Sequence, residues 1–312
     1  MQTSFYQRIK YCVLTALPSS LKTSFWLLKL MLPISLVVRL LDYYGAIVYL
    51  SNFFQPLFNL IGLSGSLAIV FITSVFLPLY GTIAVMASLA MTLREATILS
   101  LMCLVAHNLF VECAVTHKTG SSYVGMILLR IGMAFVVATF LNVLLPVDNT
   151  PFVLSIATHS SNSIHELLTD WLTSSFYLII TVLFIVTALF ILQRLLLEFE
   201  LIEKMSKPLK PLMKLFGLPE NSPFLWIVGN LAGLAYGGAI MVDMVKQGKL
   251  SLQDANTVNY HLSISHSLLE DTLLFAALGI NLGIIVGTRL FFAFMVVWVR
   301  RGLYFLFSRR RV

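Results

Sequence analysis

The stretch His107-Asn-Leu-Phe-Val-Glu112 is matched by His266-Ser-Leu-Leu-Glu-Asp271 at an offset of 159 residues. Both stretches lie in segments apolar enough for a bilayer, where polar and charged side chains are costly. The same offset continues on both sides, pairing Glu95 with Asp254, Ala96 with Ala255, Gly120 with Gly279, Arg130 with Arg289, Ala134 with Ala293 and Phe135 with Phe294. A repeated set of costly residues predicts a duplicated unit built around a functional centre.

The composition is that of a membrane protein. Of 312 residues, 58% are hydrophobic and 11% are charged, and the mean hydropathy is +0.90. Several apolar windows exceed the roughly 20 residues that cross a ~30 Å hydrocarbon layer, so the sequence predicts an all-α polytopic protein. Many basic residues behind the net charge of +7 flank apolar segments, which indicates orientation in the membrane and not nucleic-acid binding. Three cysteines without ligand spacing predict neither a disulfide framework nor a zinc site.

The duplication extends over almost the whole chain. At slightly shorter offsets, the segment 55–63 (QPLFNLIGL) matches 210–218 (KPLMKLFGL), and Tyr80-Gly81 matches Tyr236-Gly237. We expect each copy to contain an interfacial helix, a glycine-interrupted apolar segment and about three membrane-spanning helices. The expected boundaries are an amphipathic interfacial segment at 1–24 without a signal-peptide cleavage site, a first copy at 25–146, a polar extracytoplasmic connector at 147–172, a second copy at 173–306 and a basic cytoplasmic tail at 307–312.

The two glycine-interrupted segments, near 65–90 and 222–247, could cross the membrane as kinked helices or enter and return as hairpins. If both cross, the lysines of 204–214 lie on the opposite face from Lys246 and the C-terminal arginines. If both are re-entrant, these basic residues share one face, and the exceptions to the positive-inside tendency are Arg94 and Arg39. The charge distribution therefore favours two hairpins and six spans in the cytoplasmic membrane, with both termini cytoplasmic and the second copy inverted relative to the first.

One acid breaks the repeat. On a continuous helix, His266 and Glu270 are four residues apart and face the same way, whereas Asp271 points about 140° from the histidine. In the first copy Val111 takes the place of Glu270, and Glu112 is five residues after His107. We therefore expect the two sites to have different roles.

The remaining polar residues divide into two groups. Counted from the short turns near 119 and 279, acid and arginine lie at comparable depths on adjacent helices in each copy, which predicts the structural ion pairs Glu112–Arg130 and Asp271–Arg289. The repeated histidines, His107 and His266, favour a polar cavity. Imidazole can accept a proton, bind a divalent metal or hydrogen-bond an organic solute, and the residues leave these options open.

Two runs carry a family resemblance: Leu93-Arg-Glu-Ala96 through His107 to Lys118, and Asp254-Ala-Asn256 through His266 to Thr272. They resemble Gate-domain, or nucleoside-recognition-domain, membrane proteins, which include the gate regions of ferrous-iron transport B proteins and the spore maturation proteins and are related to concentrative nucleoside transporters. The resemblance implies substrate held between the hairpin tips and the helices behind them. By position, the tip residues would be Tyr80, Gly81, Tyr236, Gly237 and Gly238, faced by His107, Asn108, His266, Ser267 and Glu270.

The chain departs from the iron-transport pattern because no Gly-Cys-x-x-Pro stands at either tip and no P-loop motif occurs. We therefore expect a secondary permease, not an enzyme, that moves a small polar or ionic solute by alternating access, with a nucleoside-like solute as one candidate. No cofactor is expected, H+ or Na+ could couple the movement, and the expected partners are the solute, the bilayer and a second copy of this chain. The alternatives are a non-transporting membrane scaffold or partner subunit and a divalent metal ion transporter. A membrane hydrolase is weakest, because no nucleophile or three-ligand metal set accompanies the histidines.

Overall fold

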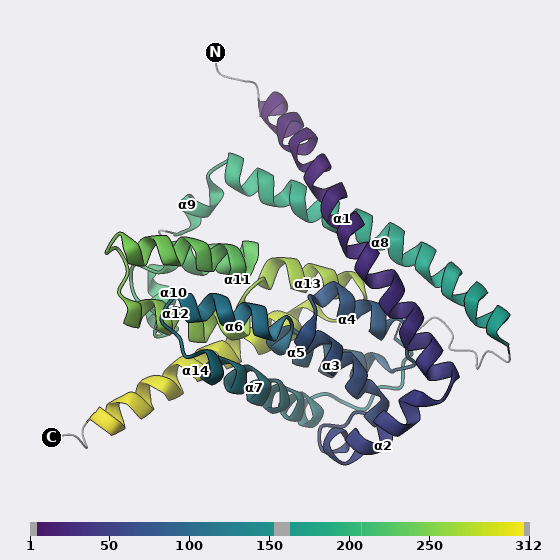
Figure 1. Cartoon of the computed structure of the whole chain (residues 1–312). Coiled ribbons are helices and arrows are strands. Elements are labelled where there is room, and N and C mark those ends of the chain that lie inside the picture. The colour runs from purple at the N-terminus through teal and green to yellow at the C-terminus, as the bar shows by residue number, and fades with distance from the viewer. Residues whose placement is uncertain (1–4, 153–162, 207, 309–312) are drawn as a thin grey trace.

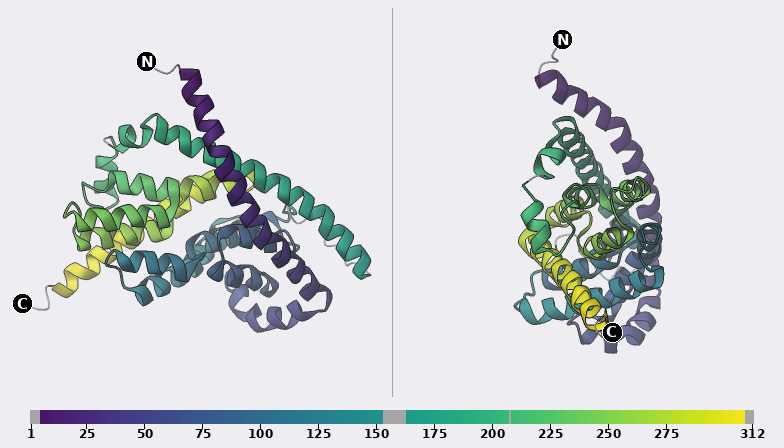
Figure 2. Two further views of the ribbon diagram at one scale, coloured as in Figure 1. Left: turned by 45° about the horizontal axis from the view of Figure 1, so that its top comes forward. Right: turned by 90° about the vertical axis from the view of Figure 1, so that its left-hand side faces the viewer.

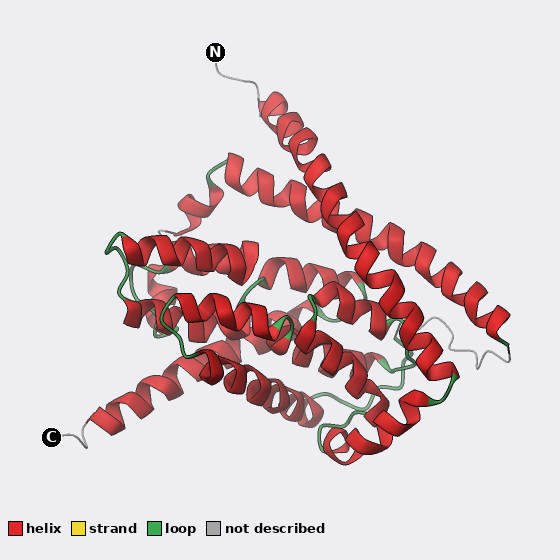
Figure 3. Ribbon diagram, in the orientation of Figure 1, coloured by secondary structure: helices red, strands yellow, loops and turns green. Residues whose placement is uncertain are grey.

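A computed structural model describes residues 5–152, 163–206 and 208–308. Within these residues the chain is helical and forms no strand, apart from an isolated bridge between Thr92 and Pro151 (Figure 3). Five of the described helical segments are long and apolar enough to cross a membrane, namely Phe5–Tyr43, Leu93–Lys118, Tyr123–Leu144, Ile164–Glu198 and Leu282–Leu306. The prediction of an all-α polytopic membrane protein is confirmed.

Each copy contributes one set of helices (Figure 1). The first set is α1 (Phe5–Tyr43), α2 (Ala46–Asn59), the 3-10 turn η1 (Gly65–Leu67), α3 (Ala68–Phe76), α4 (Leu79–Met86), α5 (Leu93–Ala106), α6 (Leu109–Lys118) and α7 (Tyr123–Leu144). The second set is α8 (Ile164–Glu198), α9 (Leu201–Ser206), α10 (Lys210–Leu215), α11 (Pro223–Lys246), α12 (Leu252–Ser265), α13 (Leu268–Ala277) and α14 (Leu282–Ser308).

The sequence repeat is also a repeat of local structure. Helices α5 and α12 both have 14 residues, and α6 and α13 both have 10. The turns agree as well, because Gly120 and Gly279 have φ angles of 93° and 92°. Such angles favour glycine, so these two positions close equivalent turns in the two copies.

Both glycine-interrupted segments fold back on themselves. In the first copy, α3 ends at Phe76, Leu77 and Pro78 follow with ψ angles of 157° and 155°, and α4 then packs against α3. In the second, α11 is interrupted at Gly233, which has φ 82° and ψ 173°. A Cβ atom on Gly237 would lie 3.1 Å from the Cα of Gly229, so the two arms of α11 are in backbone contact. The second break is therefore three residues before Tyr236, the first of the predicted tip residues of this hairpin.

The long helices α1 and α8 pack against each other and cross beside the remaining bundle (Figures 1 and 2). No break separates residues 5–24 from the rest of α1, although the sequence predicts a distinct interfacial segment at 1–24, whose first four residues lie outside the described part. The reason is packing on α8: Cys12 and Ala16 are buried, and Arg8 Nε donates to Glu198 Oε1 at 2.8 Å.

Helix α8 begins at Ile164, so the end of the connector predicted at 147–172 is helical, and residues 153–162 lie outside the described residues. Likewise α14 continues to Ser308, so the predicted tail at 307–312 begins within this helix, and 309–312 are not described.

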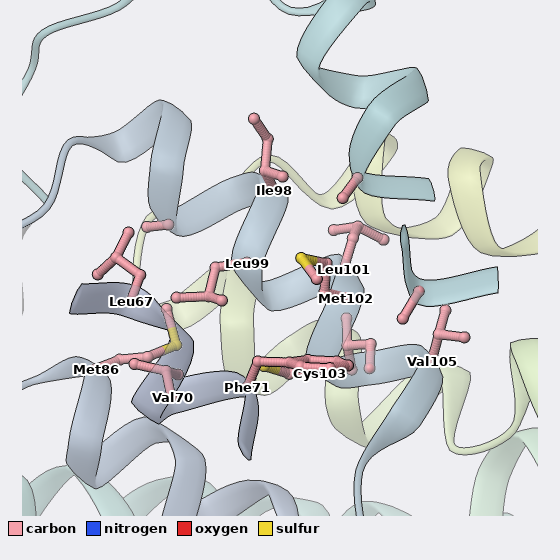
Figure 4. Close-up of a cluster of buried hydrophobic side chains, with 14 of the residues drawn as sticks. Leu67, Val70, Phe71, Met86, Ile98, Leu99, Leu101, Met102, Cys103 and Val105 are labelled. Atoms are coloured by element: carbon pink, nitrogen blue, oxygen red, sulfur yellow. The ribbon is translucent and has the colours of Figure 1, made fainter. Parts of the chain in front are cut away.

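The core surrounds α5. Leu99, Met102 and Cys103 are fully buried against residues of α3 and α4, including Phe71 and Met86 (Figure 4). A helix that is apolar all round belongs in such an interior. Packing of α5 fixes the position of His107, which follows its last turn.

The sixth predicted span, formed by α12 and α13, is not among the five apolar segments. Asn259, His261, Ser263 and Ser265 make α12 polar, yet all four are buried. Polar residues inside a membrane bundle face the protein interior, so a helix enclosed by its neighbours does not need an apolar surface.

Candidate functional site

Both repeated histidines stand at breaks between two helices. His107 ends α5 in an extended conformation with ψ 156°, and Asn108 then takes left-handed angles of φ 45° and ψ 36° before α6 begins. His266 and Ser267 repeat this pattern between α12 and α13, with ψ 159° at the histidine and φ 52° at the serine. Left-handed non-glycine residues are uncommon and often mark functional sites.

The backbone N–H groups that these breaks leave without a helical partner donate hydrogen bonds to the hairpins. The Asn108 N–H donates to the carbonyl oxygen of Ser74 at 2.8 Å, and the Ser267 N–H donates to that of Gly229 at 2.9 Å. Ser74 lies in α3 and Gly229 in the first arm of α11, so each copy ties its broken span to its own hairpin. An unpaired amide inside a membrane is costly, and these contacts remove that cost.

The freed carbonyls are bound by the repeated arginines. Arg130 donates from Nε to the Val105 carbonyl at 2.7 Å and from Nη2 to the His107 carbonyl at 3.0 Å. Arg289 makes the equivalent bonds to the carbonyls of Ile264 and His266. A guanidinium has several donors in a fixed plane, so one side chain satisfies two backbone acceptors and still reaches an acid.

The same arginines contact the acids that the sequence pairs with them. Arg130 Nη1 lies 2.7 Å from Glu112 Oε2, and Arg289 Nη1 lies 3.3 Å from Asp271 Oδ2. Both arginines are buried, with 1% and 0% of their surface exposed. The sequence anticipated the acidic partners but not the carbonyl contacts, which depend on the unexpected breaks.

Both repeated histidines also contact Glu112. His107 Nε2 lies 3.4 Å from Glu112 Oε1, His266 Nε2 lies 3.1 Å from Oε2, and the two rings are 5.1 Å apart between centroids. All three side chains are buried. We call His107, Glu112 and His266 the histidine centre. It is assembled from both copies, since His266 reaches across to an acid of the first copy.

Hydrogen bonding assigns the tautomers of this centre. His266 Nδ1 lies 2.8 Å from the Leu262 carbonyl oxygen, and His107 Nδ1 lies 3.2 Å from those of Cys103 and Leu104. Carbonyl oxygens only accept, so each Nδ1 carries a hydrogen, and Nε2 of a neutral ring is then an acceptor. Two acceptor nitrogens therefore face a carboxylate, and a proton or another cation between the two atoms would relieve the repulsion of each close contact.

Glu270 points to a different partner from His266. Its Oε1 accepts a hydrogen bond of 2.9 Å from the hydroxyl of Tyr80, at the start of α4 in the first copy. The structure thus differs from the expectation that His266 and Glu270 share one helix face, because the left-handed Ser267 separates α12 from α13. Like the His266–Glu112 contact, the Tyr80–Glu270 bond joins the two copies.

The other predicted tip residues have packing contacts. A Cβ atom on Gly81 would meet the Leu77 side chain at 3.1 Å, and one on Gly238 would lie 2.3 Å from Val115 of α6. Gly237 is in contact with Gly229 in the opposite arm. Tyr236 is 54% exposed. These glycines allow close approach of helices, whereas the tyrosines are the tip residues available to a ligand.

A cavity of about 170 Å³ lies between α8, α11 and α13, and Tyr80 and Glu270 are part of its wall. The remaining lining is Val186, Leu189, Phe190, Leu196, Leu197, Glu200, Phe224, Val228, Leu231, Tyr236, Ile240 and Leu269. The contribution of α8 could not be read from the sequence, because its apolar residues look like those of any lipid-facing helix. We call this space the apolar cavity.

Although the sequence predicts no three-ligand metal set beside the histidines, the histidine centre has the donor set of a transition-metal site, because the fold brings together ligands from both copies. One atom from each of its residues lies within 4.8 Å of the others, and two imidazoles with a carboxylate suit Zn²⁺ and related ions. However, the Arg130 guanidinium already contacts the Glu112 carboxylate at 2.7 Å and brings positive charge to the same oxygen. The arrangement therefore fits a proton with less repulsion than a divalent ion.

No family model matches the chain, and no solved structure matches it. A curated protein of Bacillus subtilis (strain 168), described as the uncharacterized membrane protein YvoD, is 30% identical over 275 residues, which cover 87% of this chain and 88% of the relative. That description agrees with the apolar helices in placing such chains in a membrane.

Proposed function

The chain belongs to the membrane-protein family of YvoD from Bacillus subtilis, and we propose that it is a proton-coupled secondary permease for a small solute. The observation that carries this proposal is the histidine centre, where two imidazole nitrogens face one buried carboxylate, an arrangement suited to binding and releasing a proton. The centre lies where broken helices and hairpins of both copies meet. Discontinuous helices around a polar centre are a recurring design of secondary transporters.

We also propose that the two copies are inverted and re-entrant at their hairpins, as in Gate-domain proteins, with both termini on the cytoplasmic side of the inner membrane. Two arginines depart from the expected charge distribution, and both have local partners. Arg94 donates to Asn142 at 2.7 and 2.6 Å, and Arg39 donates to the Ser174 hydroxyl at 3.2 Å. These contacts account for the positions of Arg94 and Arg39. The distribution of the remaining basic residues supports the inverted arrangement.

Equivalent positions test the inversion. Ser122 and Asn281 precede α7 and α14 at the 159-residue offset, and both are exposed. In a background without the three native cysteines, Ser122→Cys should react with a membrane-impermeant maleimide only from the cytoplasmic side, and Asn281→Cys only from the outside. Labelling of both from the same face would contradict inverted copies.

Access to the interior tests transport. Leu269 lines the apolar cavity, whereas Leu101 of α5 is fully buried in the core. Alternating access predicts that Leu269→Cys reacts with a small impermeant thiosulfonate applied from either face, and that Leu101→Cys reacts from neither. A membrane scaffold predicts that both positions stay unreactive, and that result would remove the permease proposal.

Proton coupling has its own test. Proteoliposomes loaded with pyranine should acidify when a transported solute is added outside, in a screen of nucleosides, amino acids, quaternary ammonium ions and Mn²⁺. Glu112→Gln should abolish this acidification, because it removes the carboxylate that shares the proton with both histidines. Glu220→Gln, an exposed acid, is the matched control. Unchanged acidification in Glu112→Gln would exclude the histidine centre from coupling.

A divalent metal ion transporter is the second candidate, favoured by the donor set of His107, Glu112 and His266. It predicts that purified protein binds Mn²⁺ or Zn²⁺ with one site per chain in calorimetry, and that His107→Ala removes this binding. Metal binding that survives His107→Ala would assign the ion to another place in the chain.

A further inference from the structure

Glu270 differs from the other two acids of the interior. Glu112 and Asp271 each contact an arginine, at 2.7 and 3.3 Å. Among the described residues, Glu270 bonds to the Tyr80 hydroxyl and has no basic partner. Glu270 is half-buried, and a carboxylate that is partly withdrawn from water without a counter-charge favours a nearby cation.

The surroundings of Glu270 offer such a cation a site. The apolar cavity has two acids in its wall, Glu270 and the exposed Glu200, and no lysine, arginine or histidine among its described lining residues. Its electrostatic character is therefore negative. Positive charge is favoured there, and an anionic solute such as a nucleotide is disfavoured.

The remaining lining residues of the apolar cavity favour a solute with an apolar body. Four aromatic rings line the cavity, those of Tyr80, Phe190, Phe224 and Tyr236, and the other lining residues apart from the two acids are aliphatic. Aromatic faces attract ammonium groups through their quadrupole, and quaternary ammonium ions are recognised in this way. Few polar groups line the cavity, so a strongly hydrated solute such as a sugar would lose more hydrogen bonds than it gains.

We infer that the apolar cavity is a binding site for a lipophilic monovalent organic cation, whose charge contacts Glu270 beside the Tyr80 hydroxyl and whose apolar groups contact the aromatic and aliphatic wall. This inference rests on the proposed permease, for which it names the substrate class. The cation would supply the counter-charge that Arg130 and Arg289 supply to the other acids. The site also joins the copies, since Tyr80 belongs to the first and Glu270 to the second.

Binding of benzyltrimethylammonium to the purified full-length protein in nanodiscs, measured by isothermal titration calorimetry against empty nanodiscs, tests the inference. We expect saturable binding with one site per chain, and none for benzylsulfonate, which has a similar body and the opposite charge. Glu270→Gln should weaken binding by about ten- to hundredfold, because a charged contact is lost. Glu220→Gln is the exposed-acid control and should bind as wild type does.

A second variant separates the cavity from the charge. Leu231→Trp keeps Glu270 and fills part of the space between α8 and α11, so it should also prevent binding. Thermal unfolding of each variant verifies that it is folded. No binding to wild type, equal binding of the sulfonate, or binding unchanged by both Glu270→Gln and Leu231→Trp would overturn the inference.

The outcome is distinguishable from that of the permease proposal. Cysteine accessibility and pyranine acidification do not require this ligand, so a permease for another solute would pass those tests and fail the calorimetry. Conversely, a protein that binds benzyltrimethylammonium at Glu270 but keeps Leu269→Cys unreactive from both faces would be a cation-binding membrane protein without transport.

Discussion

Replacing Arg130 by methionine should destabilise the protein strongly, because one buried side chain makes three contacts. The substitution keeps an apolar stem of similar length but leaves the carbonyls of Val105 and His107 unpaired and the Glu112 carboxylate without its cation. Two hydrogen bonds within a membrane contribute about 0.6 kcal/mol each on average. Breaking a buried ion pair costs about 3–5 kcal/mol in soluble proteins.

The carboxylate therefore dominates, and because the three contacts share one group they do not add. We expect Arg130→Met to lower the free energy of unfolding by about 2–4 kcal/mol. This is less than the value for soluble proteins, because polar groups also find hydrogen-bond partners in the unfolded state within the membrane. The measurement is reversible unfolding by SDS in mixed micelles, followed by circular dichroism. Arg194→Met, on an exposed arginine of α8, is the matched control and should stay within about 0.5 kcal/mol of wild type.

The double variant Arg130→Met with Glu112→Gln decides which contact matters. If the uncompensated acid is the main cost, neutralising it should recover at least about half of the loss, a coupling of about 1–2 kcal/mol. No recovery would place the cost in the two carbonyls. A loss below about 0.5 kcal/mol in Arg130→Met, the range of an ordinary surface substitution, would refute the role assigned to this arginine.

Other substitutions test the packing around the site. Gly238→Ala should lower the free energy of unfolding by about 1–3 kcal/mol, because its Cβ would lie 2.3 Å from Val115. Adding Val115→Ala to this variant should restore part of the loss. Equal unfolding of the single and double variants would contradict the contact. Asn259→Ala should cost about 1–3 kcal/mol in the same assay, since Nδ2 donates to the hydroxyls of Thr119 at 2.7 Å and Ser121 at 2.8 Å across the copies. The native cysteines should resist maleimide until SDS unfolds the chain, because all three are buried: Cys12, Cys103 and Cys113. Rapid labelling of folded protein would show that the interior opens more than the structure indicates.

Much of the fold could be read from the sequence because it depends on local pattern and internal repetition. Hydropathy and length predict apolar helices, and Pro78, Gly233 and their neighbours interrupt two segments that then fold back. The acid and arginine of each pair could be matched by counting from short turns on adjacent helices. These features depend on residues close together in the sequence, so they can be predicted from one sequence without knowledge of the tertiary contacts.

The breaks at the histidines were not predicted, although one signal was present. Asn108 belongs to a residue type that tolerates left-handed angles, but Ser267 does not stand out in this way. Without the breaks, His266 and Glu270 would share one helix face, and the arginines would have no free backbone carbonyls to bind. Only the folded backbone reveals that each arginine serves a broken helix.

The sequence by itself determined that this protein is duplicated, helical and membrane-embedded, and that its costly residues are two histidines, three acids and two arginines. Only the tertiary structure decided which of them meet, because the decisive contacts cross between the copies. His266 of the second copy reaches Glu112 of the first, and Tyr80 of the first reaches Glu270 of the second. The sequence repeat shows which residues each copy contains. Contacts between the copies depend on how their surfaces pack, and the repeat does not predict that packing.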